Sequence, residues 1–303
     1  MTGWVTLSIM AAAFQTLRFM LQKQLSMGRL TAEGATFARF AYAAPFAALA
    51  AALWLIPQGG WPALWPARGA LFWPYALGGC LAQILATWCV VALFQRRNFA
   101  VGITLKKTET ILTALVGFVV LGDTVSAWGA AAIATGLAGV LILTDMPELK
   151  GRGLRRVLNI EAGLGVASGV FFALSAVGYR GATLEVESDV ALTRALATLA
   201  VVTAAQAGGM ALWLRWHAPG QVGAVVAAWR PGVWMGLTSM AGSACWFTAF
   251  TLMNAAYVFT VGQIEVIFSI AASVLWFRER MSAREALGIA VLTASILGLV
   301  LLG

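Results

Sequence analysis

Charge is scarce in this sequence. Only 11% of its 303 residues are charged and 61% are hydrophobic, whereas a soluble domain has about 25% charged residues. This composition predicts a multi-pass protein embedded in the lipid bilayer, and we expect no separate soluble domain. The net charge of +8 does not indicate a nucleic-acid partner, because the basic residues cluster in short loops between apolar runs, as loops on the cytoplasmic face do.

Histidine and cysteine are rarer still. The chain has one histidine, His217, and three cysteines, none in a Cys-x-x-Cys spacing. These counts argue against a zinc site, a disulfide framework and the convergent side chains of an enzyme. The ATP-binding motif GxxxxGK[ST] is missing too, so ATP does not drive this chain by itself. We expect no catalytic residue, no metal and no cofactor. Because the N-terminus lacks basic residues, we also expect no cleaved signal peptide.

The sequence has long apolar runs instead. A helix that crosses a membrane needs about 20 mostly apolar residues. Ten such runs can be counted. We therefore predict an all-α, polytopic membrane protein with ten transmembrane helices, at about residues 4–22, 34–56, 71–94, 100–121, 126–144, 161–180, 190–214, 232–253, 257–277 and 283–302.

One stretch of the chain occurs twice. Cys89–Ser126 and Cys245–Ser282 align without a gap, and polar residues match as well as apolar ones. The matched polar pairs are Asn98 with Asn254, Glu109 with Glu265, Asp123 with Glu279 and Ser126 with Ser282. Internal repeats decide architecture, so we predict two five-helix repeats, residues 1–150 and 151–303. Because five is odd, the repeats must be inverted relative to each other, as in many secondary transporters.

The fifth and tenth runs, Ala127–Thr144 and Ala283–Leu302, hold small and aliphatic residues almost throughout. In the fifth run, Ala130, Ala134 and Ala138 recur at the four-residue spacing that permits close helix contact. We expect these two helices to pack, or to form the interface of a homodimer, and not to reach a substrate.

Polar and ionisable residues inside the other runs are the candidate site, because an ionisable residue within a membrane is costly and marks function by default. At helical spacing these residues fall on stripes. We expect the first, third, fourth, sixth, eighth and ninth helices to present them to a central cavity. The candidate cavity residues are Phe14, Gln15, Arg18, Gln83, Trp88, Lys106, Glu109, Phe172, Tyr179, Trp246, Tyr257, Gln263 and Glu265.

These residues suit a zwitterionic substrate. Glu109 and Glu265 would accept hydrogen bonds from an ammonium group, Arg18 and Lys106 would bind a carboxylate, and the aromatic rings would form a wall. Structural interpretations compete with this one. Arg18 and Lys106 lie near enough to helix ends to extend to the membrane interface. Lys106 and Glu109 are spaced to pair with each other, and the two glutamates could close a helix break.

At these residues the chain resembles the drug/metabolite transporter superfamily, in its EamA-type ten-helix branch. Members carry an arginine in the second helix of each repeat, here Arg39 and Arg194. They also have a glutamate step in the fourth helix, here Glu109 and Glu265, then an acidic residue and a Ser or Thr before the fifth. The proline that usually follows the glutamate is missing in both halves, and Arg278 replaces a glycine. A bend at the glutamate step would then need another cause.

The resemblance implies a secondary transporter of a bacterial-type inner membrane that moves a small-molecule substrate by alternating access. Members of the superfamily transport amino acids, nucleotide sugars, triose phosphates or drugs. We expect export of amino acids, aromatic ones included. A transporter of drugs, or of sugars and phosphorylated metabolites, is an alternative. A channel is another alternative, although the repeated filter residues of a channel are not recognisable.

The distribution of charge predicts the orientation. Basic residues crowd the odd-numbered loops, and the even-numbered loops have few outside a mixed-charge segment around residues 180–194. The positive-inside rule then places the odd loops in the cytoplasm and both termini outside, whereas members of the resembled family commonly have cytoplasmic termini. The basic residues of the odd loops are Lys23, Arg29, Arg96, Arg97, Lys150, Arg152, Arg155, Arg156, Arg215, Arg230, Arg278, Arg280 and Arg284.

Overall fold

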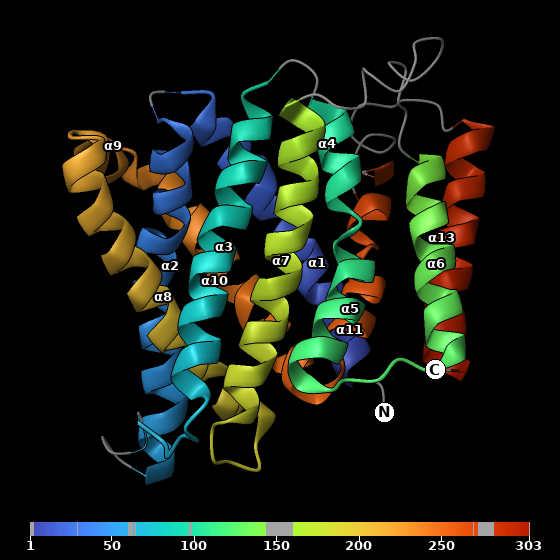
Figure 1. Ribbon diagram of the computed structural model, residues 1–303. Helices are drawn as coiled ribbons and strands as arrows, with labels where there is room; N and C mark the ends of the chain where they lie inside the picture. Colours follow the sequence, from blue (N-terminus) through green and yellow to red (C-terminus); the bar gives the residue numbers. More distant parts are fainter. Residues whose placement is uncertain are drawn as a thin grey trace.

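The computed structural model describes residues 3–28, 30–59, 63, 65–96, 99–143, 160–268, 270–271 and 282–302. The named elements in these ranges are all helices (Figure 1), which confirms the all-α prediction. They are α1 (Gly3–Ser26), α2 (Ala32–Gly59), α3 (Phe72–Phe94), α4 (Phe99–Lys106), α5 (Glu109–Leu121), α6 (Ala127–Leu143), α7 (Ile160–Leu184), α8 (Ala191–His217), α9 (Gln221–Ala227), α10 (Trp229–Leu252), α11 (Ala255–Gly262) and α13 (Ala283–Leu302).

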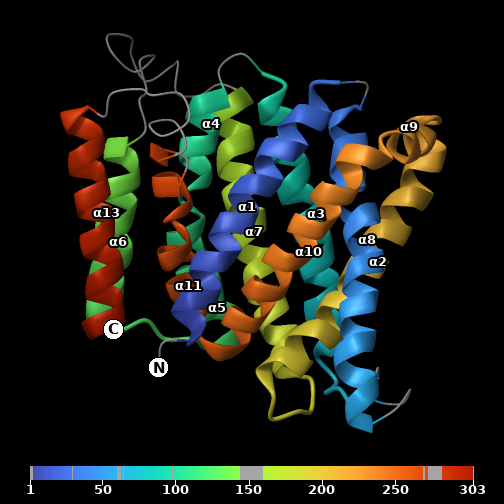
Figure 2. The same ribbon diagram turned by 180° about the vertical axis from the view of Figure 1, so that it is seen from behind.

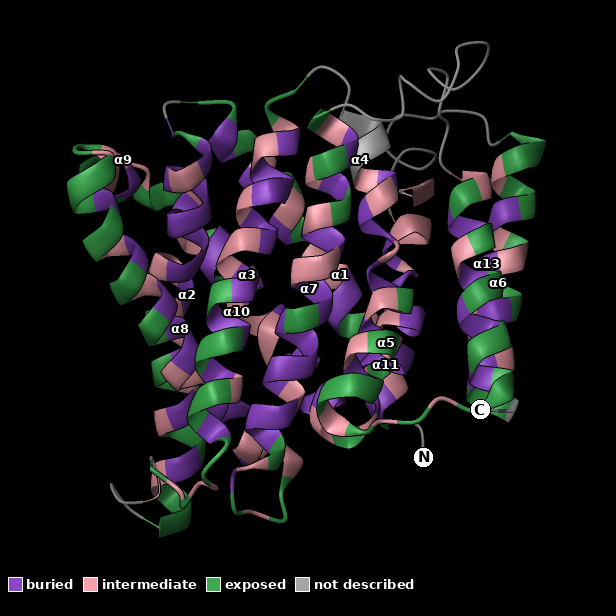
Figure 3. Cartoon of the chain, viewed as in Figure 1, coloured by how far each residue is buried: buried purple, intermediate pink, exposed green. Residues whose placement is uncertain are grey.

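Six of the described helices, α1, α2, α3, α7, α8 and α13, are long and apolar enough to cross a membrane. Their outward faces expose large apolar side chains such as Leu53, Leu81 and Leu297. Figure 3 shows this exposed surface around the rim of the bundle, with buried residues on the faces that point inward. This distribution is typical of a protein whose outer surface contacts lipid. The last part of the predicted ninth span, residues 272–277, lies outside the described residues.

The run predicted as one span at residues 100–121 is in fact two helices, α4 and α5, with a break at Lys107 and Thr108. The break has a local cause. The backbone N–H groups of Lys107 and Thr108 bond to carbonyls three residues back, at 3.0 and 3.1 Å, and the Thr108 hydroxyl donates to the Leu105 carbonyl at 2.7 Å. A threonine hydroxyl that bonds the backbone competes with the regular helix in this way.

The same break occurs at the matching position of the second half. There α11 ends at Gly262, two turn residues follow, and helix resumes at Glu265. Ile264 and Val266 again bond to carbonyls three residues back, at 3.1 and 3.0 Å. The repeated glutamates, Glu109 and Glu265, are therefore each the first helical residue after a break. Broken helices at membrane depth are tolerated where protein surrounds them.

The two halves of the chain are interleaved. The most extensive helix contacts are α3 with α7, α1 with α10, α6 with α13 and α2 with α8, each of which joins one half to the other. Helix α1 starts at the end of the molecule where the termini lie, whereas α7 starts at the opposite end (Figure 1). The opposite directions support the inverted-repeat interpretation. The proposed boundary at residue 150 lies outside the described residues, so the division into 1–150 and 151–303 stays a prediction.

Both ends of the chain lie at the same end of the bundle (Figures 1 and 2), as an even number of crossings requires. Lys23, Arg96 and Arg215 stand at the other end, where α1, α3 and α8 finish.

We expect a C-terminal reporter that fluoresces only in the cytoplasm to stay dark, because the positive-inside rule places the basic end of the bundle in the cytoplasm. A reporter on the loop between α1 and α2 is the matched control and should be bright. Fluorescence from the C-terminus with a dark loop would reverse the orientation.

Helices α6 and α13 stand together at one side of the bundle and pack mainly on each other (Figures 1 and 2). Ala130, Ala134 and Ala138 do not make this contact, because they are exposed on another face of α6; their contact with a second copy of the chain stays a prediction. Gly136 and Gly139 face α13 instead, where they lie against Ser295 and Leu292. Glycines permit a closer approach of two backbones than alanines, and only the tertiary structure shows which small residues face the partner.

A substitution at Gly139 tests the contact between α6 and α13. A Cβ atom at this position would lie 2.9 Å from the Leu292 backbone nitrogen and 3.2 Å from the Gly288 carbonyl oxygen. Backbone atoms cannot move aside, so we expect Gly139→Leu to lower the free energy of unfolding by at least about 1–3 kcal/mol, the usual range for overpacking. Ala138→Leu, on the exposed face, is the matched control and should change it by less than about 0.5 kcal/mol. Equal melting temperatures of the two variants in detergent would contradict the packing.

Candidate functional site

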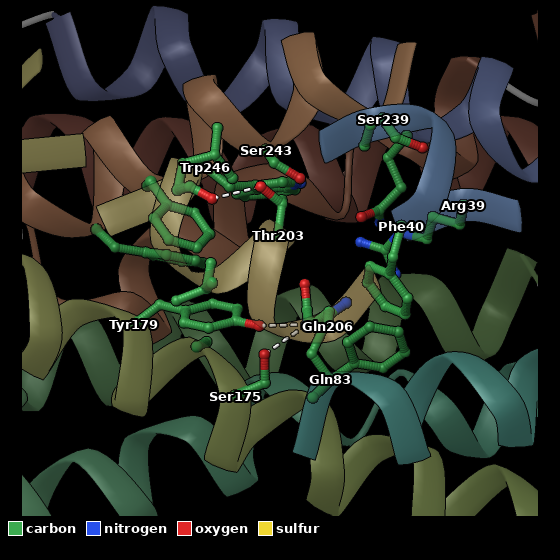
Figure 4. A pocket seen from close by; sticks show the side chains of 18 of the residues that line it. Arg39, Phe40, Gln83, Ser175, Tyr179, Thr203, Gln206, Ser239, Ser243 and Trp246 are labelled. Atoms are coloured by element: carbon green, nitrogen blue, oxygen red, sulfur yellow. Dashed lines mark hydrogen bonds between the residues drawn. The ribbon is translucent and has the colours of Figure 1, made fainter. Parts of the chain in front are cut away.

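A central cavity lies inside the bundle, between helices α1, α2, α3, α7, α8, α10 and α11 (Figure 4). It has about 50 Å³ of space for the centres of water molecules, which is room for a few waters. Its lining combines polar and aromatic side chains on an aliphatic background. The polar and aromatic residues that line it are Gln15, Arg39, Phe40, Gln83, Phe172, Ser175, Tyr179, Thr203, Gln206, Ser239, Ser243, Trp246, Phe247, Phe250 and Phe259.

Arg39 supplies the positive charge of the cavity wall. Its side chain is buried, and it donates to the Thr87 hydroxyl on α3. With the amide of Gln83 turned so that its oxygen faces Arg39, that oxygen accepts from both terminal nitrogens of the guanidinium, at 2.8 and 3.0 Å. The Gln83 nitrogen then donates to the Ser175 hydroxyl on α7. One polar chain thus joins α2, α3 and α7 across the cavity.

A second pair of hydrogen-bonded polar side chains forms the neighbouring part of the cavity wall. Gln206 of α8 donates to the Tyr179 hydroxyl of α7 at 2.8 Å, and Tyr179 packs on Phe247 with ring centroids 4.4 Å apart. Ser239 of α10 is different, because its hydroxyl is buried without a hydrogen-bond partner. Figure 4 shows Ser239 and Arg39 on the same side of the cavity. The hydroxyl of Ser239 and the guanidinium of Arg39 are therefore available to a bound molecule.

Three aromatic rings form the apolar wall. Trp246 and Phe250, one turn apart on α10, stack with centroids 5.7 Å apart, and Phe259 of α11 meets both edge-on at 5.4 Å. Gly262 leaves space for the Trp246 ring, since a Cβ atom at residue 262 would clash with it. Rings fixed in this way offer a rigid surface to a flat or apolar group.

A charged layer adjoins the cavity at the two helix breaks. Lys106 and Glu109 form a buried ion pair at 2.9 Å, as their spacing predicted. Lys107 and Glu265 form a second buried ion pair that joins the first half of the chain to the second. Gln15, which lines the cavity, donates to the other oxygen of Glu265 at 2.6 Å. Both glutamates are thus engaged by a lysine, and neither lines the cavity itself.

The structure brings together five of the predicted site residues in the cavity wall: Gln15, Gln83, Phe172, Tyr179 and Trp246. Four more, Lys106, Glu109, Gln263 and Glu265, lie in the charged layer at the helix breaks. There Gln263 donates to the Thr110 hydroxyl at 2.7 Å.

Arg18 also lies beside the cavity and not in its wall. It is buried, donates to Gln22 at 3.1 Å, and its guanidinium carbon is 4.2 Å from the centre of the Phe19 ring.

Three predicted residues lie elsewhere. Trp88 donates to Glu33 at 3.1 Å and lines an apolar groove on the outer face, between α3 and α8. Phe14 packs in the apolar cluster around Trp4. Tyr257 holds the start of α6, where its hydroxyl accepts from the Ser126 backbone N–H at 3.0 Å.

Half of the cavity residues that the sequence prediction missed come from α2 and α8, which were not expected to reach the cavity. Arg39, Thr203 and Gln206 are polar residues inside apolar runs. Their position inside apolar runs could have indicated that they face the protein interior. The spacing of Thr203 and Gln206 was a second, weaker indication: they are three residues apart and therefore share one face of α8.

A separate charged contact closes the end of the bundle where the termini lie. Arg180, near the end of α7, makes two hydrogen bonds to the carboxylate of Asp123, at 2.7 and 3.1 Å. It also donates to the carbonyl oxygens of Phe250 and Met253, at 2.6 and 3.0 Å. We call this arrangement the Arg180 clamp. It joins the loop before α6 to the corner between α10 and α11.

Comparison with known proteins agrees with this geometry. Residues 159–301 match the model of the EamA-like transporter family. This match covers most of the second half of the chain. Together with the long apolar helices, it indicates a multi-pass membrane transporter rather than an enzyme. No curated protein sequence matches the chain. A crystal structure with 15% sequence identity superimposes over 99% of this chain and 97% of its own, with a TM-score of 0.73. At that identity the likeness shows a shared fold, which confirms the polytopic prediction.

Proposed function

We propose that this protein is an EamA-like secondary transporter of small carboxylate-bearing metabolites, amino acids among them, which it exports across a bacterial-type inner membrane. The observation that carries the proposal is the cavity inside the bundle, which is lined both by Arg39 and by the rings of Trp246, Phe250 and Phe259. A buried guanidinium binds a carboxylate in two parallel hydrogen bonds, and the rings accept an apolar side chain.

The interleaved halves support alternating access. Each of the main helix contacts joins the two halves, and two half-chains of opposite direction around a central site are the usual construction of such transporters. The cavity has room for only a few waters, so a substrate the size of an amino acid would enter after the helices around it separate. A homodimer through α6 and α13 stays a prediction, and their outer faces, with Trp128 and Leu297 exposed, are free to make it.

The experiment that tests the proposal is transport by purified protein in liposomes, with a panel of unlabelled amino acids, organic acids, sugars and drugs as competitors. Competition by carboxylate-bearing compounds, and none by uncharged sugars or cationic drugs, would support it. Competition by drugs alone would favour the drug-transporter alternative. Single-channel currents in a planar bilayer would favour a channel.

Trp246→Ala tests the aromatic wall. We expect transport of large aromatic substrates to fall at least about tenfold, a loss of about 1.4 kcal/mol, because the variant loses the stacking surface. Small substrates should be affected much less. Trp234→Ala is the matched control on the same helix, since Trp234 is 63% exposed and faces away. An equal loss for large and small substrates in Trp246→Ala would make the ring structural.

A further inference from the structure

The charges buried around the cavity do not balance. Among the described residues, four cationic side chains are buried in the layer that includes the cavity and the helix breaks, Arg18, Arg39, Lys106 and Lys107. Only two carboxylates accompany them, Glu109 and Glu265, and each is paired with a lysine. The region thus carries a net charge of about +2 when all groups are ionised.

The excess positive charge lies on the two arginines, because both lysines are paired with glutamates. Arg18 contacts Gln22 and the Phe19 ring, and Arg39 contacts Thr87, Gln83 and the Phe40 ring. In the described part of the chain, no carboxylate lies within ion-pair distance of either one. A buried charge without a counter-charge is strongly unfavourable, so the empty cavity attracts anions.

Arg39 has donors left for such an anion. A guanidinium carries five N–H groups. Thr87 takes one of them and the Gln83 oxygen takes two, which leaves two for a ligand. The unpartnered hydroxyl of Ser239, 3% exposed, lies on the same side of the cavity (Figure 4).

We propose that the preferred substrate of the cavity is a small organic dianion, such as a dicarboxylate, with one acidic group bound directly by Arg39. This inference rests on the proposed transport function and narrows its substrate class. A zwitterionic amino acid adds no net charge and leaves the excess in place. Its ammonium group would also meet no carboxylate in the described cavity wall. A substrate with two negative charges neutralises the excess, with Arg18 contributing through its field from beside the wall.

The test uses compounds matched in shape and different in charge. Purified transporter in liposomes takes up labelled succinate, and unlabelled succinate, butyrate, L-glutamate, L-glutamine and glycerol 3-phosphate compete. At neutral pH succinate carries two negative charges, butyrate carries one, L-glutamate has a single net negative charge because of its ammonium group, and L-glutamine has none. We expect succinate to compete at concentrations at least about tenfold lower than butyrate and L-glutamine, a difference of about 1.4 kcal/mol, and L-glutamate to compete less well than succinate. Inhibition by glycerol 3-phosphate at lower concentrations than by unlabelled succinate would support the dianion and identify a phosphate ester as its source.

Arg39→Gln should abolish the preference of the cavity for succinate over butyrate and raise the melting temperature, because it removes an uncompensated buried charge. Arg230→Gln makes the same charge change at an exposed position and should alter neither. If Arg39→Gln does not fold, Arg39→Lys is the second variant. It keeps the positive charge but cannot form bidentate hydrogen bonds to a carboxylate, so the preference for the dianion should become smaller without disappearing.

Two outcomes would overturn the proposal, and they are distinguishable. If labelled L-glutamine and L-phenylalanine are transported as well as labelled succinate, the dianion preference is wrong while the transport function stands. If none of the labelled compounds is transported, the proposed transport of carboxylates is itself wrong. An unchanged preference in a folded Arg39→Gln variant would remove Arg39 from substrate binding.

Discussion

Glu265→Gln is expected to lower the free energy of unfolding by about 3–5 kcal/mol, the usual cost of removing one partner of a buried ion pair. The sequence alone would treat Glu265 as a substrate acid that glutamine could replace without damage to the fold. The structure changes this expectation, because the substitution leaves Lys107 buried opposite an uncharged amide. The excess positive charge around the cavity would rise as well. Chemical unfolding in detergent measures the effect.

A second substitution should restore the stability that Glu265→Gln loses. Lys107→Met combined with Glu265→Gln removes both charges, and we expect it to recover most of the lost stability, because an uncharged pair leaves no isolated ion. Glu187→Gln, in an exposed loop, is the control and should change stability by less than about 0.5 kcal/mol. A single variant as stable as the wild type would show that the pair does not contribute to folding.

Transport by the double variant then separates structure from mechanism. Glu265 also accepts a hydrogen bond from Gln15 in the cavity wall, so its carboxylate positions a group that a substrate would touch. We expect the stable double variant to transport at least about tenfold more slowly, a loss of about 1.4 kcal/mol in the limiting step. Wild-type flux would confine Glu265 to a structural role.

Arg180→Gln is expected to open the end of the bundle where the termini lie. The Arg180 clamp holds Asp123 and two carbonyl oxygens of the corner between α10 and α11. Hydrogen bonds of a charged group contribute about 1.5–3 kcal/mol each, so this contact is strong enough to set the balance between a closed and an open end. If the halves move against each other during transport, the clamp must break once in each cycle.

Accessibility of the cavity measures this effect. Ser243 lines the cavity, and Ser243→Cys can be labelled in a chain whose three native cysteines are replaced and which still transports. With Arg180→Gln added, we expect a membrane-impermeant maleimide applied from the side of the termini to label at least about tenfold faster. Transport should fall, because the closed state is no longer stable.

Two comparisons make the labelling result specific. Asp123→Asn should act in the same direction as Arg180→Gln, since it weakens the same contact. Arg194→Gln is the control at the same end of the bundle, because the Arg194 guanidinium donates to the nearby carbonyl of Ser188 and to no residue of another helix in the described ranges. Equal labelling rates in the wild type and in Arg180→Gln would show that the clamp does not close this end.

The sequence by itself determined the class of the protein. Apolar runs of about 20 residues with few charges predict helices that cross a bilayer, and the repeated Cys89–Ser126 stretch predicted which helices correspond. The aligned glutamates, Glu109 and Glu265, indicated a special position in each half, and the structure places a helix break immediately before both. Such features are local or periodic, and periodicity can be read along a chain.

Only the tertiary structure decided which polar groups meet. The spacing of Lys106 and Glu109 predicted their pair, because both lie on one segment. The pair of Lys107 with Glu265 joins segments far apart in the chain, and no pattern in either segment specifies the other. The same is true of Arg39 in the cavity, of Trp88 on the outer face, and of the glycine stripe that α6 turns toward α13. In a membrane nearly every side of a helix is apolar, so hydrophobicity does not show which side faces the protein interior. That choice depends on packing between helices, which the three-dimensional arrangement alone defines.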